Sequence, residues 1–349
     1  MLSPFEDPIE EERRADIDQI EDDKNYGKDK VCIPIEKKDY RKKAIDPKKD
    51  NNMFIYFLDG SMRTKFIGEY SSGVVSFPLL ASEISVAIVK RENKDIKPCI
   101  SENKLFFIFP DKESGLISDD TIDRLKELKS SSPGFGIEFL KKTNLNVADV
   151  RYSMLSKARR LMHEMEHTLA KQLEKEEKSW LIMDGAIRKS EFLNFNFTIG
   201  LAKSFSRTPL FKLNNERNPL TTTAYLKNLG VGERSLVFKK KKQDNTISKK
   251  TAFWFVRIRK APPNMEPLGG IVKIDFNSDK DDLSENDLDL IDQISAEIYS
   301  MRLPSVYPWP RWPNYIYPIR MAEQYMSSQF LNKEYISHIG MVIKNAISG

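Results

Sequence analysis

Hydrophobic residues are spaced in two ways along this chain, and each spacing predicts a different kind of element. Short apolar runs of strand length begin at Met53, whereas apolar residues recur every three to four positions over 147–177, as in an amphipathic helix. We predict strands at 53–59, 73–80, 84–90, 104–109, 180–183, 195–202, 235–239, 251–258 and 270–276, and helices at 119–128, 147–177, 286–301, 318–330 and 332–347. Strands, a long helix and then alternating elements predict an α/β fold with a mixed sheet flanked by helices, in one main domain.

The first 50 residues lack this patterning. They are rich in charged side chains and poor in large apolar ones, so they have little surface to bury. We predict that residues 1–50 form a charged arm that is flexible or binds a partner, and that residues 51–349 form the folded domain.

Two predicted strands end in the same way. Residues 54–58 lead into Asp59 and residues 180–183 lead into Asp184, with a glycine after each aspartate. An aspartate at the end of a buried strand projects its carboxylate into a cleft while the glycine lets the backbone turn away. We therefore expect Asp59 and Asp184 to lie on adjacent strands and to share divalent metal ions.

The helix between them offers a third carboxylate. At ~100° per residue, Glu166 lies roughly 80° from the centre of the apolar stripe and Glu164 roughly 120°. Although a glutamate on a charged helix is most often simply solvated, Glu166 can reach a cleft at the end of the sheet. Three clustered carboxylates repel one another unless metal neutralises them, and oxygen ligands suit Mg²⁺ or Mn²⁺. Two such ions about 4 Å apart would support phosphodiester cleavage.

These residues resemble the motifs of the NurA nucleases. Asp59-Gly60 is similar to the first motif of that family, and Glu166 and Asp184 are similar to the second and third. The resemblance continues along the chain at 200–203, at 253–257 and at 315–323.

The resemblance implies a ribonuclease-H-like core, a homodimer, and Mn²⁺-dependent exonuclease and single-strand endonuclease activity on DNA. It also implies a HerA-type hexameric ATPase that pumps DNA, in end processing, repair or antiviral defence. Tyr315 falls at the tyrosine of the last motif, and Glu323 stands where the family has a histidine. Glu323 adds negative charge at that position, so a catalytically inactive DNA-binding or assembly subunit is a second hypothesis.

Basic residues supply candidates for phosphate binding. Lys203 and Arg257 end apolar strands, where they would stabilise charge on a phosphate or form a salt bridge at a sheet edge. The densest basic cluster comprises Lys239, Lys240, Lys241 and Lys242. This cluster would hold a DNA backbone, or it is a solvated hairpin tip.

A competing motif lies on the long helix. His163, Glu164 and His167 match the H-E-x-x-H pattern, in which two histidines bind Zn²⁺ and the glutamate is the general base of a metalloprotease. The same wheel places the histidines roughly 140° and 180° from the apolar centre, which faces them away from an enclosed cleft. The zinc protease is therefore an alternative without supporting context.

Composition narrows the class of protein. The 349 residues include two cysteines, which argues against a disulfide scaffold. The chain has no secretory signal and no apolar run near the ~20 residues of a membrane span, so we expect a cytoplasmic protein. Its net charge of +5 is too mild to indicate nucleic-acid binding by itself. It lacks a phosphate-binding G-x-x-x-x-G-K-[ST] loop, so any ATP-driven step would belong to a partner.

Overall fold

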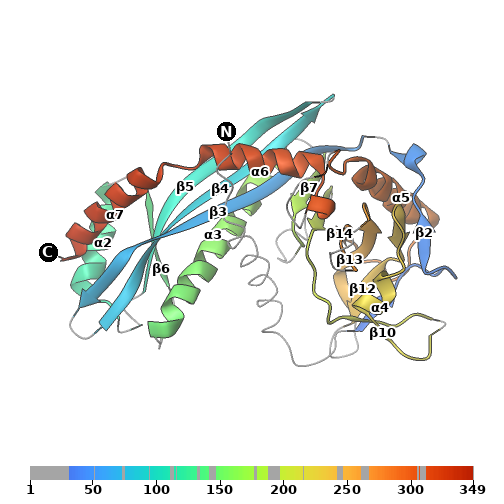
Figure 1. Cartoon of the computed structure of the whole chain (residues 1–349), viewed down its shortest axis with the longest axis horizontal. Coiled ribbons are helices and arrows are strands. Elements are labelled where there is room, and N and C mark those ends of the chain that lie inside the picture. Colours follow the sequence, from blue (N-terminus) through green and yellow to red (C-terminus); the bar gives the residue numbers. More distant parts are fainter. Residues whose placement is uncertain are drawn as a thin grey trace. The chain divides into compact units, whose positions relative to one another are not determined.

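The chain divides into two compact units, each made of segments that are far apart in sequence. The computed structural model describes residues 31–50, 52–72, 75–93, 95–110, 114, 116–131, 134–140, 147–176, 179–187, 197–214, 216–241, 247–260, 267–304, 306 and 312–348. The first unit comprises Met1–Phe57 and Lys178–Arg320, and the second comprises Leu58–Glu177 and Met321–Gly349. Strand β3 (Phe54–Ser72) and helix α6 (Tyr317–Gln329), both labelled in Figure 1, each begin in the first unit and end in the second.

The first unit is a twisted sheet with one long helix. Its elements are β1 (Val31–Pro34), β2 (Lys42–Ala44), η1 (Pro47–Lys49), β7 (Trp180–Asp184), β8 (Thr198–Ala202), β9 (Leu210–Phe211), β10 (Leu220–Thr221), α4 (Thr222–Leu226), β11 (Glu233–Ser235), β12 (Phe238–Lys241), β13 (Ile247–Arg257), β14 (Ile271–Asn277), α5 (Glu285–Ser300) and η4 (Trp312–Asn314). The strand order is β10-β9-β1-β12-β13-β14-β8-β7. The β7–β8 pair is parallel and the β14–β8 pair is antiparallel, so the sheet is mixed.

Alternate residues of β13 explain how this sheet is buried on both faces. Trp254 points towards α5, where its Nε1 donates to Ser295 Oγ at 3.0 Å. Phe253 and Phe255 point to the other face and join a cluster of buried aromatic and aliphatic residues around Phe211. Because side chains alternate along a strand, one apolar run supplies both layers.

Residues 31–50 belong to this sheet, which differs from the predicted arm. Strand β1 pairs with β12 and β9, and β2 pairs with β11. The charged residues of the segment find partners far along the chain: Glu36 accepts two hydrogen bonds from the buried Arg234, at 2.9 and 3.1 Å. A charge pattern typical of a solvated segment is here satisfied by tertiary ion pairs. Residues 1–30 of the predicted arm lie outside the described residues.

The second unit is built on three long strands. Its elements are β3 (Phe54–Ser72), β4 (Val75–Glu92), β5 (Asp95–Pro110), α2 (Asp119–Ser131), β6 (Gly136–Leu140), α3 (Val147–Glu176), α6 (Tyr317–Gln329) and α7 (Lys333–Ser348). Strands β4 and β5 are antiparallel, and β6 is parallel to β5. Figure 1 shows α3 lying along these strands, and α2 packs against α7.

The predicted strands 73–80 and 84–90 are one continuous strand, β4. Its middle holds three buried polar residues, Ser82, Glu83 and Ser85, which interrupt the apolar pattern. One oxygen of Glu83 has a partner inside the second unit, where Oε1 accepts from the backbone N–H of Leu331 at 2.7 Å. The polar interruption therefore marks a buried contact and not a turn.

The α/β class with a mixed sheet and C-terminal helices is confirmed. Strand β7 is followed in the strand order by β3, whose first residues, 54–57, belong to the first unit. The Glu297 carboxylate on α5 anchors this end of β3 by accepting the backbone N–H groups of Met53 and Phe54, at 2.7 and 3.0 Å.

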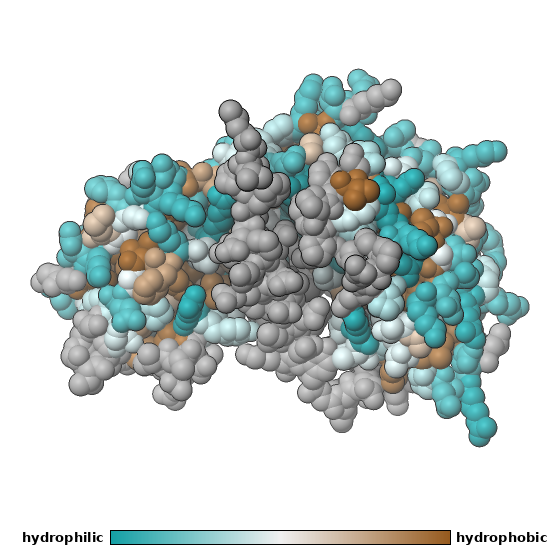
Figure 2. Space-filling model, in the orientation of Figure 1, coloured by the Kyte–Doolittle hydropathy of each residue, from teal (hydrophilic) through white to brown (hydrophobic). Residues whose placement is uncertain are grey.

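The described surface is mainly hydrophilic on the face in Figure 2, where hydrophobic residues form small, separate patches. None of the described helices combines the length and the apolar character that a membrane crossing requires.

Candidate metal centre

Asp59 lies within β3, five residues after Phe54, and the strand continues to Ser72, so the predicted strand end at Asp59 is wrong. Its side chain is mostly buried, with 6% of the residue exposed. The Oδ1 atom accepts the backbone N–H of Gly60 at 2.8 Å, which orients the carboxylate relative to the strand. A buried carboxylate needs such donors or a cation to offset the loss of water.

Glu166 on α3 lies directly against the next residue of the same strand. A Cβ atom added to Gly60 would lie 2.4 Å from Glu166 Oε1 and 3.0 Å from Met162 Cγ, so only glycine allows this approach. Glu166 is 6% exposed, and its Oε2 lies 2.8 Å from Nδ1 of His163, one turn earlier on the helix. The helical position at the border of the apolar stripe thus places Glu166 against Gly60 of β3.

Asp184 ends β7 beside the parallel strand β8. Gly185, the next residue, has a φ of 97°, a left-handed conformation that favours glycine, and its N–H donates to Leu201 O at 2.9 Å. The chain therefore turns away immediately after the aspartate. This is the geometry that the Asp-Gly pattern predicts.

Lys203, the residue after β8, forms an ion pair with Asp184. Its Nζ lies 2.8 Å from Asp184 Oδ2 and 3.8 Å from the centroid of the Tyr315 ring. Asn314, which the sequence did not indicate, donates from Nδ2 to Lys203 O at 2.7 Å and accepts the N–H of Gly270. Lys203 is buried, so its charge is held in place by an aspartate and an aromatic face.

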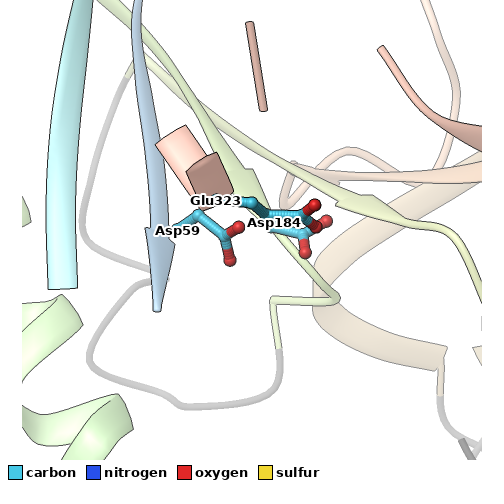
Figure 3. A group of neighbouring side chains, drawn as sticks. All are labelled: Asp59, Asp184 and Glu323. Atoms are coloured by element: carbon cyan, nitrogen blue, oxygen red, sulfur yellow. The ribbon is translucent and has the colours of Figure 1, made fainter. Parts of the chain in front are cut away.

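Three carboxylates come together at these positions. Asp59, Asp184 and Glu323 each offer one oxygen, and these oxygens all lie within 4.8 Å of one another (Figure 3). Glu166 is not a member of this group. At bond lengths near 2.1 Å, oxygens on one Mg²⁺ are up to about 4.2 Å apart, so small side-chain adjustments would let the group bind a shared ion. The donor set, oxygen atoms only, suits Mg²⁺ or Mn²⁺.

Other predicted site residues lie elsewhere in the first unit. Arg257 donates from Nη1 to Gly269 O at 2.8 Å and from Nη2 to Pro267 O at 2.9 Å. Burial lowers the pKa of its guanidinium. These contacts to backbone carbonyls give Arg257 a structural role, holding the residues just before β14.

Two of the four predicted cluster lysines, Lys239 and Lys240, do not share one surface. Lys239 is fully buried, with 0% exposed, and its Nζ pairs with Asp281 at 3.3 Å, whereas Lys240 is exposed. Alternation along β12 separates them, because successive side chains point to opposite faces. The side chain of Lys241 and all of Lys242 lie outside the described residues.

The zinc pattern has no metal-binding geometry around it. His163 pairs with Glu166, Glu164 is exposed and His167 is half-buried. Within the described part of the chain, no candidate metal group contains either histidine. His163 and Glu166 are three positions apart on a helix, a spacing that brings two side chains together. The sequence therefore indicated the contact between His163 and Glu166 as well as the zinc pattern.

Together, a mixed α/β sheet and a group of carboxylates from two strands and a helix define a protein suited to bind divalent metal. The model of the NurA domain matches residues 53–327. The chain therefore belongs to the NurA family and is a nuclease. The solved structures include a similar one, the NurA nuclease from Sulfolobus solfataricus, at 10% identity and a TM-score of 0.38, covering 79% of this chain and 80% of that one. A search of curated proteins found no match.

Proposed function

We propose that this protein is a deoxyribonuclease that depends on Mn²⁺ or Mg²⁺, acting as an exonuclease and as a single-strand endonuclease. The observation that carries the proposal is the group of carboxylate oxygens from Asp59, Asp184 and Glu323 within 4.8 Å of one another. Family membership supports the same chemistry.

In this proposal Asp59, Asp184 and Glu323 hold the metal. The bound ions would supply an activated water and stabilise the leaving oxygen of the phosphodiester. Glu166 is a further acidic group, held against Gly60 and oriented by His163. Because the carboxylates belong to different elements, the folded chain, and not a local motif, creates the binding site.

In this proposal Lys203 and Tyr315 lie where the phosphate of the DNA substrate binds. The Lys203 Nζ lies beside Asp184 Oδ2 and over the Tyr315 ring, so both contacts fix where the ammonium group sits. A fixed cation at that place would stabilise the negative charge that develops on the phosphate.

The biological setting follows from the family alone. We propose a cytoplasmic homodimer that works with a HerA-type hexameric DNA-translocating ATPase, in DNA end processing or defence. Binding of a purified HerA-type ATPase, measured by co-elution on size exclusion, tests the partnership independently of cleavage.

Glu323 supports a second candidate. A glutamate in place of the family histidine adds a charge to the site, which is compatible with an inactive subunit that binds DNA or assembles with the ATPase. This hypothesis predicts ATPase binding without cleavage of any DNA substrate.

The decisive experiment is a cleavage assay on single- and double-stranded DNA with Mn²⁺, Mg²⁺ or a chelator. We expect metal-dependent cleavage that falls by about two orders of magnitude in Asp59→Asn, as for loss of one contact that stabilises the transition state. Asp123→Asn, an exposed aspartate on α2, is the matched control and should cleave normally.

A second pair of variants separates the nuclease from the zinc protease. Glu166→Gln and Glu164→Gln make the same substitution at two glutamates of α3. Glu166 is buried and Glu164 is exposed. We expect only Glu166→Gln to lose DNA cleavage. Loss in Glu164→Gln and His163→Ala together with a Zn²⁺ requirement would overturn the nuclease mechanism.

A further inference from the structure

A cavity of about 320 Å³ lies in the first unit, at the ends of β7 and β8. Its wall includes Ala186, two residues after Asp184, and Ser204, the residue after Lys203. Because consecutive Cα atoms are 3.8 Å apart, the Cα of Ala186 lies within about 7.6 Å of that of Asp184. The cavity therefore adjoins the Asp184–Lys203 pair, and its volume is in the range of small-molecule sites.

Aromatic rings form much of the wall. Phe205, Phe211, Phe253 and Phe255 all line the cavity, and the rings of Phe205 and Phe255 lie 4.9 Å apart between centroids. Phe205 is half-buried, whereas the other three belong to the buried aromatic cluster. A planar, apolar ligand would find stacking surface here.

A charged pair adds hydrogen-bonding groups to this apolar wall. Lys273 and Asp275 lie two residues apart on β14 and form an ion pair, with side chains 12% and 4% exposed. The Oδ2 of Asp275 also accepts the N–H of Ile187 at 3.2 Å, and Lys273 Nζ lies 4.7 Å from the centroid of Phe253. A buried ion pair is not needed for stability, since apolar residues of similar size often do as well. A donor and an acceptor beside aromatic rings do, however, match the polar edge of a nucleobase.

We propose that this cavity receives the base of an unpaired nucleotide in a DNA strand that runs past Asp184 and Lys203. The inference rests on the proposed function, because it takes DNA as the substrate. The exposed Lys240, which also lines the cavity, would contact the backbone of the same strand. A base-paired nucleotide has its polar edge occupied and its faces stacked, so the cavity would favour unpaired strands over duplex.

The test measures base stacking without cleavage. Single-stranded oligonucleotides carry the fluorescent base 2-aminopurine at each position in turn and bind the full chain in the presence of a chelator. We expect strong quenching at one position or at two neighbouring positions, and none in a fully paired duplex. Uniformly unchanged fluorescence along a strand that binds would overturn the proposal.

Three variants connect the signal to the cavity. Phe205→Ala removes a half-buried stacking ring and should weaken single-strand binding roughly tenfold while abolishing the quenching, as for loss of one stacked base. Lys240→Ala should weaken binding and retain the quenching. Lys212→Ala, an exposed lysine of the same unit that does not line the cavity, is the control and should change neither.

A filling variant keeps the test decisive if Phe205→Ala does not fold. Ser206→Trp adds volume at the cavity wall without removing a ring, and it should likewise abolish the quenching. Unchanged quenching in a folded Ser206→Trp protein would contradict the proposal.

Further outcomes distinguish a free mononucleotide from a DNA strand as the source of the base. They also distinguish failure of the cavity proposal from failure of the proposed nuclease function. If free 2-aminopurine deoxyribonucleotide is quenched and no position in a strand responds, the cavity binds a mononucleotide and the strand proposal is wrong. If the wild type cleaves DNA but the cavity variants bind as it does, the cavity proposal fails and the nuclease stands. Wild type that cleaves no DNA with any metal contradicts the proposed function instead.

Discussion

Gly60 lets the Glu166 carboxylate approach strand β3 closely in the second unit. It follows Asp59 on β3, and its missing side chain leaves the space that the Glu166 carboxylate occupies. The second partner of Glu166 is His163, on the same helix. Glu166 is therefore positioned by its contact with Gly60 on β3 and by His163 on its own helix.

We predict that Gly60→Ala lowers DNA cleavage while leaving the fold intact. The new Cβ would lie 2.4 Å from Glu166 Oε1, the end of a flexible side chain that can move away, so the free energy of unfolding should change by only about 1 kcal/mol. Cleavage rates and thermal unfolding measure the two effects separately. Gly134→Ala is the control, because its Cβ would meet only the Tyr335 hydroxyl, at 4.0 Å. Full activity of Gly60→Ala would mean that Glu166 needs no fixed position.

At the scale of elements, buried ion pairs attach the N-terminal strands and α5 to the first unit. Arg234 on β11 is buried and donates both to Glu36, which follows β1, and to Asp292 on α5, with Nε 2.7 Å from Oδ1. Lys43 on β2 donates to the other oxygen of Asp292 at 2.7 Å. Burial raises the pKa of the Asp292 carboxyl, but the Lys43 hydrogen bond and the Arg234 charge outweigh it, and the pKa lies below its usual value of 3.8.

This pKa predicts how stability depends on pH. A carboxyl with a lowered pKa stabilises the fold above the pKa of the unfolded chain, and the contribution is lost as pH falls through the folded value, below about 3.8. Asp292→Asn should therefore cost about 3 kcal/mol at pH 7, where it removes one of the two carboxylate partners of the buried Arg234, and less at pH 3. Urea unfolding followed by tryptophan fluorescence at both pH values measures the difference. Asp289→Asn removes the more exposed partner of Lys49 and should cost less than about 1 kcal/mol. Equal losses in the two variants would contradict a buried network.

At the scale of the whole molecule, the carboxylate group unites positions that are distant in sequence. Asp59 and Glu323 are separated by most of the chain, and Asp184 lies between them on another strand. An unfolded chain cannot keep such oxygens together, so metal would bind the native state far better than the unfolded state.

We predict that Mn²⁺ stabilises the wild-type protein against thermal unfolding. At a metal concentration 100 times Kd, the gain is about 2.7 kcal/mol, and a chelator should remove it. Calorimetry with and without Mn²⁺ measures this change in unfolding temperature. Asp59→Asn and Asp184→Asn should lose the response, while Asp123→Asn on α2 should keep it. An equal response in all four proteins would show that the ion binds elsewhere.

The local pattern of residues determined most of the elements and the acidic candidates. Apolar periodicity encodes the face that an element buries, and this preference depends only on near neighbours in sequence, so α3 and the strands ending at Asp184 and Ala202 were predictable. The Asp-Gly pattern likewise predicted the turn at Gly185, because a left-handed φ is a local requirement. The family motifs located the same residues.

Only the tertiary structure decided which side chains meet. The ion pair of Glu36 and Arg234 spans 198 positions, and it converts a segment predicted to be a solvated arm into part of a sheet. In the same way, pairing of β12 within the sheet buries Lys239, and strand and helix placement brings Glu323, and not Glu166, into the group with Asp59. A charged side chain is equally compatible with solvent or a buried partner until distant segments pack, since its environment is set by those segments and not by its neighbours in sequence.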